Sequence, residues 1–232
     1  MKILEKINQK AGNNKDFGGI TVAFLGDSVT QNCFENGIID TKHGYERYFM
    51  DIMAMLYPSV PVSIIYAGIS GDNARGGAAR VERDVISHTP DLTIVCYGLN
   101  DCGDSEKYIE RYTNALATIF DRLHECGSEV IFLTPNMMNT VVYPDLPTQE
   151  LTDYAHVTAG KQTSGMFDAY INAAKELCRE KNVPVCDCYA IWRAFYDGGV
   201  NTTALLSNKI NHPIREMHQV FAYELIKTIF TA

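Results

Sequence analysis

Short apolar runs alternate with longer amphipathic stretches along the chain from residue 20 onward. The short runs are rich in β-branched residues and nearly continuous in hydrophobicity, which is typical of strands buried on both faces of a parallel sheet. The longer stretches repeat apolar residues at helical spacing and are long enough to serve as crossover connections. The pattern therefore predicts an α/β protein in which helices cover a parallel sheet.

The boundaries of these elements follow from the same pattern. Five strands are expected, at residues 20–25, 62–66, 92–97, 130–133 and 183–186. Helices are expected at residues 45–56, 73–87, 105–126, 166–181 and, after Pro213, 214–230. Open sheets of this kind bind ligands beyond the carboxyl ends of their strands, so chemistry should be sought in the turns that follow the strands.

Two segments fall outside this alternation. Residues 135–164 form the longest stretch without clear periodicity and carry several amide, carboxyl and tyrosine side chains. Long loops in compact domains are commonly lids, so we expect this segment to fold over the site, with a disordered insertion as the alternative. Residues 1–19 are expected to be a helix against the domain or a loose arm, and residues 20–232 to form a single domain.

Composition narrows the classes of partner. Hydrophobic residues make up 46% and charged residues 21% of the 232 residues, as in ordinary globular proteins. The formal net charge of -8 gives a phosphate backbone no general attraction, so we expect no nucleic-acid partner. The sequence contains neither a signal-peptide pattern nor an apolar run of membrane-spanning length, so no membrane partner is expected either. A homo-oligomer is compatible with all of this.

The cysteines favour a reducing, cytoplasmic compartment. There are seven of them, an odd number, and they lack the paired spacing of a zinc ribbon. Cys186 and Cys188 could be read as a redox or metal pair, but we interpret them as buried strand cysteines. No metal or other cofactor is expected.

Candidate chemistry begins at the end of the first strand. Gly26-Asp27-Ser28 places a hydroxyl at a tight strand-to-loop turn, where a nucleophile would be well exposed to a ligand. The same three residues also make ordinary turns, so other positions must support the interpretation. Gly71 follows the second strand and Asn100 the third. A glycine N–H and an asparagine amide can stabilise the oxyanion of acyl transfer, whereas the alternative is that they serve a turn and a helix cap.

A histidine close to the C-terminus supplies the candidate base. His212 lies on a loop directly before Pro213, which can open the last helix. From there an imidazole can reach the active edge of the sheet and accept a proton near neutral pH. His218, inside the predicted helix, is interpreted as a surface or packing residue.

These blocks together resemble the SGNH, or GDSL-like, hydrolases. Gly26-Asp27-Ser28, Gly71, Gly98-Leu99-Asn100-Asp101 and His212-Pro213 occur in the order of that family over roughly residues 20–230. The resemblance implies a flavodoxin-like, three-layer α/β/α fold with a five-stranded parallel sheet, and esterase or lipase activity without a metal. It also implies that Ser28 attacks the ester and that the oxyanion hole consists of the Ser28 and Gly71 N–H groups and the Asn100 amide. Asp27 and Asp101 are expected to support the site.

One position departs from the family pattern. Members usually carry an aspartate three residues before the histidine, where this chain has Lys209. Because an ammonium would oppose the imidazolium that forms during catalysis, we predict that Lys209 points away from His212. The ring must then be oriented by another acceptor, either the Asn208 side chain or a main-chain carbonyl of residues 204–209.

The leading hypothesis is hydrolysis of a small ester, such as an acetyl ester of a carbohydrate, through an acyl-Ser28 intermediate. Two alternatives remain open at this point. One is a weakly catalytic carbohydrate- or ligand-binding module of the same fold, suggested by the missing aspartate. The other is acyl transfer from the same intermediate to a sugar acceptor.

Overall fold

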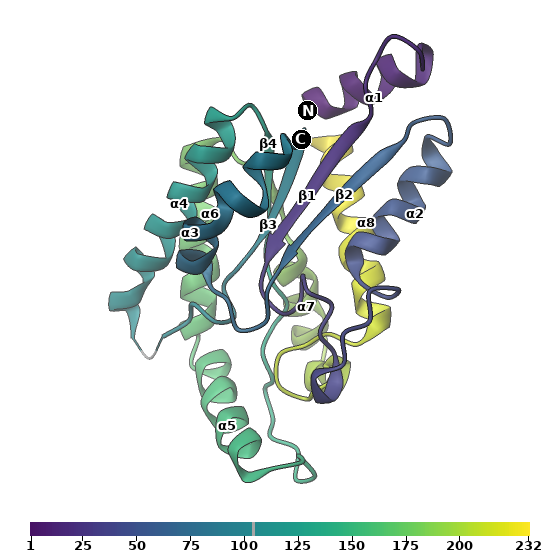
Figure 1. Ribbon diagram of the computed structural model, residues 1–232. Coiled ribbons are helices and arrows are strands. Elements are labelled where there is room, and N and C mark those ends of the chain that lie inside the picture. Colours follow the sequence, from purple (N-terminus) through teal and green to yellow (C-terminus); the bar gives the residue numbers. More distant parts are fainter. Residues whose placement is uncertain (104) are drawn as a thin grey trace.

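A five-stranded parallel sheet lies between two layers of helices in the computed structural model (Figure 1). The structure describes residues 1–103 and 105–232, except for the side chains of Asn36 and Glu106. The strands stand in the order β2-β1-β3-β4-β5, which is the flavodoxin-like order. They are β1 (Ile20–Gly26), β2 (Val62–Gly68), β3 (Leu92–Cys96), β4 (Glu129–Leu133) and β5 (Val185–Cys186). The predicted α/β/α fold is therefore confirmed.

The helices divide between the two faces of the sheet. Helices α2 and α8 pack together on one face, and α3, α4 and α6 pack on the other (Figure 1). The helices are α1 (Lys2–Gly12), α2 (Tyr45–Leu56), α3 (Ala74–Asp84), α4 (Ile109–Glu125), α5 (Gln149–Thr163), α6 (Met166–Lys181), α7 (Cys188–Asp197) and α8 (Arg215–Thr231). Short 3-10 turns occur at Glu35–Gly37, Ile86–His88, Glu106–Tyr108 and Thr202–Leu205.

The burial of each strand follows its place in the sheet. Strands β1 and β3 have neighbours on both sides and helices on both faces, and nearly every one of their side chains is buried. Strand β2 is at the edge, and half-buried and exposed positions dominate it, with Tyr66 53% exposed. The expectation of burial on both faces therefore holds for the inner strands and is wrong for β2.

Helix α7 was not predicted, and two further elements, β5 and α5, differ from the prediction for local reasons. Strand β5 has two residues instead of four, because Pro184 has no N–H to donate and can enter the ladder only through its carbonyl, which accepts from Phe132 at 3.0 Å. The segment 135–164, expected to be irregular, contains helix α5. Its start is capped by Thr148, whose side chain accepts from the Leu151 N–H at 3.2 Å.

The chain termini meet at the end of the sheet opposite to α5 (Figure 1). The Met1 amino group donates to the Ala232 carbonyl at 3.3 Å. Residues 2–12 form a helix that packs on the domain through Ile3 and Ile7, and the Glu129 carboxylate accepts from the N–H groups of Lys2 and Ile3. No helix in the described part of the chain is long and apolar enough to cross a membrane.

Candidate active site

The turn that carries Ser28 lies directly on the ends of the strands. Ser28 follows β1, and neighbouring strand ends present glycines to it. A Cβ on Gly26 would lie 2.2 Å from the Thr30 hydroxyl, and one on Gly68 would lie 2.3 Å from the Gln31 nitrogen. Only residues without a side chain leave room for the turn at these two positions. The glycines therefore set how closely the serine approaches the sheet.

Ser28 and His212 are brought into direct contact across 184 positions of sequence. The Ser28 Oγ and His212 Nε2 atoms are 2.9 Å apart. Ser28 is 3% exposed, so its hydroxyl is largely shielded from bulk water. This distance lies within the range that proton transfer from a serine to a general base requires.

The loop that carries His212 is shaped by Asn208. The Asn208 Oδ1 atom accepts hydrogen bonds from the N–H groups of Ile210, Asn211 and His212, at 2.9–3.0 Å. The His212 carbonyl in turn accepts from the Ser207 N–H at 2.7 Å. Asn208 therefore positions the His212 main chain, and its side-chain oxygen is occupied by this task.

The second nitrogen of the imidazole faces a main-chain oxygen from a distant segment. The His212 Nδ1 atom is 3.3 Å from the Phe34 carbonyl oxygen, in the loop that follows β1. Neither expected acceptor, the Asn208 side chain or a carbonyl of residues 204–209, occupies this place. With Nδ1 donating to Phe34, Nε2 is left without a proton and can accept from Ser28.

Lys209 points away from the imidazole, as predicted. Its Nζ atom donates to the Ala204 carbonyl at 3.1 Å and lies 5.6 Å from the centre of the Tyr143 ring. The backbone of Lys209 is left-handed, with φ of 58°. No charged acid therefore pairs with His212 from the position that the family pattern assigns to one.

Burial sets the basicity of His212. Desolvation lowers the pKa of its imidazole below the usual 6.5, and the hydrogen bond to Phe34 acts in the opposite direction. The ring is therefore neutral at neutral pH. A neutral imidazole is the form in which a general base is competent.

Asn100 and Gly71 lie on the turns after β3 and β2, at the same end of the sheet as Ser28. The Asn100 Nδ2 atom donates one hydrogen to the Asp72 carbonyl at 2.8 Å. Its second amide hydrogen remains available for another acceptor. Gly71 has a left-handed backbone with φ of 77° and no neighbouring heavy atom where a Cβ would be. Asn100 does not cap the next helix, because α4 begins only at Ile109.

A buried arginine supports this end of the sheet, and the sequence pattern did not reveal it. Arg80 on α3 is 8% exposed and donates to the Gly26 carbonyl at 3.0 Å and to the Tyr97 hydroxyl at 2.8 Å. It also pairs with the Asp72 carboxylate at 2.7 Å. Arg80 thus links Asp72, which accepts from Asn100, to Gly26 in the turn that carries Ser28.

The carboxyl groups of Asp27, which is buried, and Asp101, which is half-buried, lie beneath the site. Burial raises the pKa of each to about 7. One oxygen of each is satisfied: Asp27 accepts from the Val29 N–H and Asp101 from the Ala74 N–H, both at 2.9 Å. The second oxygen of each has no partner among the described residues. Neither carboxyl group is hydrogen-bonded to His212, so neither replaces the missing acid.

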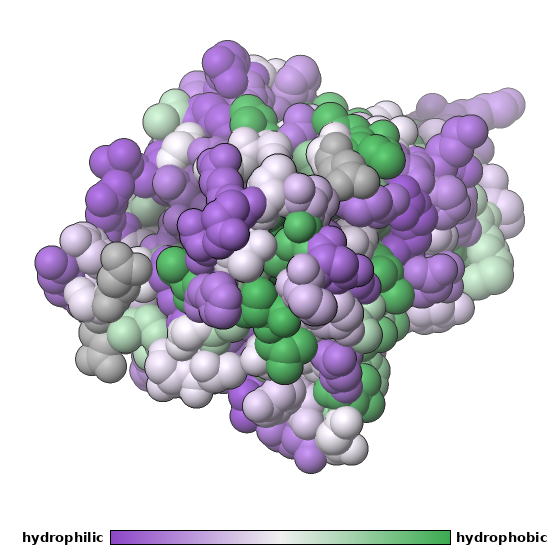
Figure 2. Space-filling view, turned by 90° about the horizontal axis from the view of Figure 1, so that it is seen from below, coloured by the Kyte–Doolittle hydropathy of each residue, from purple (hydrophilic) through white to green (hydrophobic). Residues whose placement is uncertain are grey.

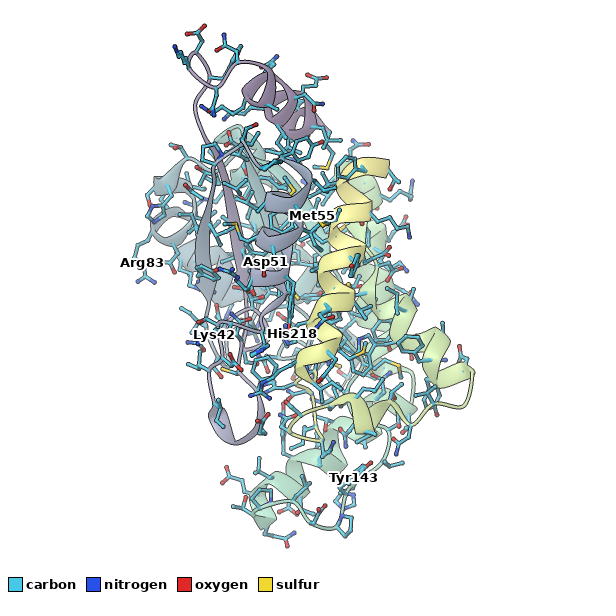
Figure 3. The ribbon with its side chains drawn as sticks, turned by 90° about the vertical axis from the view of Figure 1, so that its right-hand side faces the viewer. Lys42, Asp51, Met55, Arg83, Tyr143 and His218 are labelled. Atoms are coloured by element: carbon cyan, nitrogen blue, oxygen red, sulfur yellow. The ribbon has the colours of Figure 1, made fainter. Side chains whose placement is uncertain are left out.

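A cavity of about 480 Å³ adjoins His212 and is bordered by the segment before α5. Tyr143, labelled in Figure 3, comes from this segment. The lining combines polar and apolar side chains, namely Phe34, Glu35, Tyr143, Asp145, Leu146, Pro147, Leu151, Ser207, Asn208, Lys209 and His212, together with Gly37. Figure 2 views this end of the molecule and shows hydrophobic residues interspersed with hydrophilic ones.

The surroundings of His218, Cys186 and Cys188 indicate structural roles for these three residues. His218 is fully buried, and its Nδ1 atom accepts from the Tyr45 N–H at 3.2 Å, which fits the packing role expected for it; Figure 3 shows it near the start of α8. Cys186 and Cys188 are buried with their sulfur atoms 3.8 Å apart, but Cys188 begins α7 and is not part of a strand. Within residues 1–103 and 105–232, no three His, Cys, Asp or Glu side chains are arranged to hold a metal ion.

Comparison with protein families gives a match over most of the chain. The model described as "GDSL-like Lipase/Acylhydrolase family" matches residues 24–220. A curated acetylxylan esterase of Geobacillus stearothermophilus is 27% identical over 132 residues. That match covers 50% of this chain and 60% of the relative, so it spans less than two thirds of the relative's length.

Solved structures of similar fold cover nearly the whole chain. The crystal structure of an acetylxylan esterase from Geobacillus stearothermophilus has a TM-score of 0.69 and 22% identity, and covers 93% of this chain and 96% of its own. The acetyl xylan esterase AlAXEase has a TM-score of 0.70 and 19% identity, with 90% and 100% covered. At these identities the likeness is one of fold.

Proposed function

The chain belongs to the GDSL-like lipase/acylhydrolase family, and we propose that it is a serine esterase that removes a short acyl group, such as acetyl, from a carbohydrate. Family membership confirms the predicted SGNH resemblance and makes the protein a carboxylic ester hydrolase. The serine mechanism is supported chiefly by one observation, the 2.9 Å contact between Ser28 Oγ and a His212 ring whose other nitrogen faces a carbonyl.

In the first half of the proposed reaction, His212 Nε2 takes the Ser28 proton while Oγ bonds to the ester carbonyl carbon. The carbonyl oxygen becomes negative and is stabilised by the Ser28 and Gly71 N–H groups and the free hydrogen of the Asn100 amide. The bond to the alcohol oxygen then breaks, and this oxygen leaves with the proton from Nε2. The acyl group remains on Ser28.

The second half repeats these steps with water in place of the serine. His212 Nε2 takes a proton from water, and the hydroxide oxygen bonds to the acyl carbon. The bond to Ser28 Oγ breaks and Oγ recovers the proton from Nε2. The carboxylic acid is released, and the site returns to its starting state.

The cavity beside His212 suits an ester whose alcohol portion carries further hydroxyl groups, as a sugar does. Sugar hydroxyls need hydrogen-bonding groups, and the Tyr143, Asp145 and Ser207 side chains border this cavity. Apolar side chains such as Leu146 and Leu151 offer surface for the faces of a sugar ring. The similar proteins described as acetylxylan esterases favour an acetylated sugar for this chain as well.

The test is hydrolysis of p-nitrophenyl esters of increasing acyl length, followed by acetate release from acetylated xylooligosaccharides. We expect the acetyl ester to be cleaved with the highest kcat/KM, and Ser28→Ala to lower kcat at least about a thousandfold. Ser63→Ala, at an exposed serine of β2, is the matched control and should leave kcat unchanged. Full activity of Ser28→Ala, or turnover of long acyl chains alone, would refute the proposal.

Acyl transfer is distinguished from hydrolysis in the same assay. Adding an unacetylated xylooligosaccharide as acceptor gives an acetylated acceptor if the acyl-enzyme reacts with sugar, and free acetate if it reacts with water. We expect free acetate to remain the main product. The Phe34 carbonyl beside His212 Nδ1 favours catalysis over the binding-only alternative, because it can orient the ring in place of the missing aspartate.

A further inference from the structure

Arg215 takes no part in the proposed reaction, but it lies close to His212 in the sequence. It is the first residue of α8, three positions after His212. Its Nη1 atom donates to both oxygens of Glu35 at 3.1 Å, and its Nε atom donates to Asp40 at 2.9 Å. The guanidinium also lies 4.3 Å from the centre of the Phe34 ring. One side chain therefore contacts three residues of the loop that supplies the carbonyl to His212.

That loop, residues 33–40, is a compact unit that we call the Phe34 loop. The Phe34 N–H donates to the Ile38 carbonyl at 2.8 Å, and Cys33 forms an antiparallel bridge with Ile39. The loop is joined to the nucleophile turn by the Cys33 N–H, which donates to the Ser28 carbonyl at 2.9 Å. Because its own hydrogen bonds hold it together, the loop should shift as a whole when an outside contact is lost.

The position of this loop decides which nitrogen of the His212 imidazole carries the proton. The distance of 3.3 Å between Nδ1 and the Phe34 oxygen is already long for a hydrogen bond, so a small displacement would break it. Without an acceptor at Nδ1, the imidazole proton can move to Nε2. An Nε2–H tautomer cannot accept the proton of Ser28.

Arg215, Glu35 and Asp40 form a clamp of three charged side chains, and their charges persist over a wide pH range. Arg215 lowers the pKa of Asp40 to about 2 and also lowers the pKa of Glu35. Both carboxylates are thus charged near neutral pH. The three side chains are 20–34% exposed, so each single pair is weakened by solvent. A guanidinium that binds two carboxylates at fixed angles nevertheless holds both of them, and the loop that carries them, in one position.

We propose that Arg215 is a positioning residue for His212. It holds the Phe34 loop against the start of α8, and the Phe34 carbonyl in turn holds the imidazole in the Nδ1–H tautomer. The two groups together perform the orienting task of the aspartate that position 209 lacks. The kinetic consequence rests on the proposed esterase function, but the tautomer of His212 can be measured without any substrate.

The experiment compares Arg215→Ala and Arg215→Lys with a matched control, Arg47→Ala. Arg47 forms an ordinary exposed ion pair with Asp51 at 2.8 Å on α2. Two quantities are measured for each variant: kcat and KM with p-nitrophenyl acetate, and the nitrogen NMR shifts of the His212 ring, which report the site of its proton. Thermal unfolding shows that each variant is folded.

We expect Arg215→Ala to lower kcat by about tenfold to a hundredfold with KM changed less than about threefold, and to populate the Nε2–H tautomer. Arg215→Lys can pair with only one carboxylate at a time and should recover part of kcat and of the Nδ1–H population. Arg47→Ala should match the unmodified protein in both measurements.

Three results would overturn the proposal: a kcat within about threefold of the unmodified protein, a change confined to KM, or a fall in kcat with the Nδ1–H tautomer intact. If Arg215→Ala does not fold, the double variant Glu35→Gln/Asp40→Asn removes the same clamp from the other side and is judged by the same criteria. Absence of esterase activity in the unmodified protein would instead contradict the proposed function, and the tautomer comparison would still decide the role of Arg215.

Discussion

His212, the proposed base, is paired with a neutral oxygen instead of a carboxylate. A carboxylate next to Nδ1 attracts the imidazolium and raises the pKa of the ring, whereas a main-chain carbonyl offers only its dipole. In this chain the cost of burying a charged ring exceeds that gain, and the pKa of His212 is lowered. The ring is therefore a weaker base that stays neutral in more acidic solution.

The pH dependence of activity follows from this balance. His212 must be neutral to accept the Ser28 proton, so kcat/KM should be constant at neutral pH and should fall in acid with an apparent pKa below 6.5. The measurement is kcat/KM for p-nitrophenyl acetate from about pH 4 to pH 9, with circular dichroism to confirm folding at each point. An apparent pKa above 6.5 would show that an unrecognised negative charge acts on the ring.

Restoring the aspartate of the family pattern should not improve the enzyme. Position 209 has a left-handed backbone, and its side chain is directed toward Ala204 and Tyr143, while Nδ1 of His212 already has an acceptor. We expect Lys209→Asp to leave kcat within about threefold of the unmodified protein. Lys209→Asn, which removes the same ammonium without adding a charge, is its control. A tenfold or larger rise in kcat confined to the aspartate variant, measured with p-nitrophenyl acetate, would mean that the loop rearranges to form a triad.

The parts of the site that could be predicted from the sequence are those that need a particular side chain. Ser28 and His212 were recognisable because their residue types and strand-end positions are specific, and the structure brings them into contact. The Phe34 carbonyl could not be found in this way, because every residue carries a carbonyl. Arg215 was equally hidden, since its partners in the Phe34 loop lie at least 175 positions away.

At the level of elements, strand β2 ends in Gly68, and the absence of a side chain there lets the turn that carries Ser28 pack closely against the strand. A Cβ on Gly68 would lie 2.3 Å from the Gln31 nitrogen and 2.4 Å from the Thr30 carbonyl carbon. Both atoms belong to backbone, which cannot rotate out of the way as a flexible side chain can. The turn and the strand must therefore separate if any side chain is added.

Gly68→Ala should accordingly destabilise the protein and displace Ser28. We expect a loss of more than about 2 kcal/mol in the free energy of unfolding and a fall in kcat larger than the fall in substrate affinity. Urea unfolding and steady-state kinetics measure the two effects. Gly18→Ala is the control, because nothing lies within 4 Å of its added Cβ, and its stability should change little. Equal stability of the two variants would contradict this account of the turn.

The elements themselves were predictable where hydrophobic periodicity is strong. Helix α6 occupies the predicted residues 166–181, with an apolar face that includes Phe167, Ile171 and Ala174. Helix α5 was missed because its buried positions are Ala155, Thr158 and Gln162, two of which are polar. It lies beyond the sheet, so it buries little apolar surface and shows little pattern.

For the molecule as a whole, burial of a carboxyl group at the carboxyl end of the sheet lowers the stability of the folded protein. Arg80 and Asp72 compensate each other there, but Asp27 is buried with one oxygen unpartnered among the described residues. Burial raises the pKa of Asp27 from 3.8 to about 7. The folded protein therefore binds a proton that the unfolded chain has already lost in this pH range. Since the unfolded state binds fewer protons, stability must decrease as pH rises between these two values.

Replacing this carboxyl group should remove the pH dependence that it causes. Asp27→Asn keeps an oxygen for the Val29 N–H but cannot ionise, so we expect little change in the free energy of unfolding at about pH 4 and a gain of a few kcal/mol at about pH 8. Urea unfolding at both pH values measures the difference. The exposed Asp16→Asn, as control, should show no such gain. If Asp27→Asn is not more stable than the unmodified protein at the higher pH, the carboxylate has a partner that compensates its burial, and the stability of this end of the sheet must be explained differently.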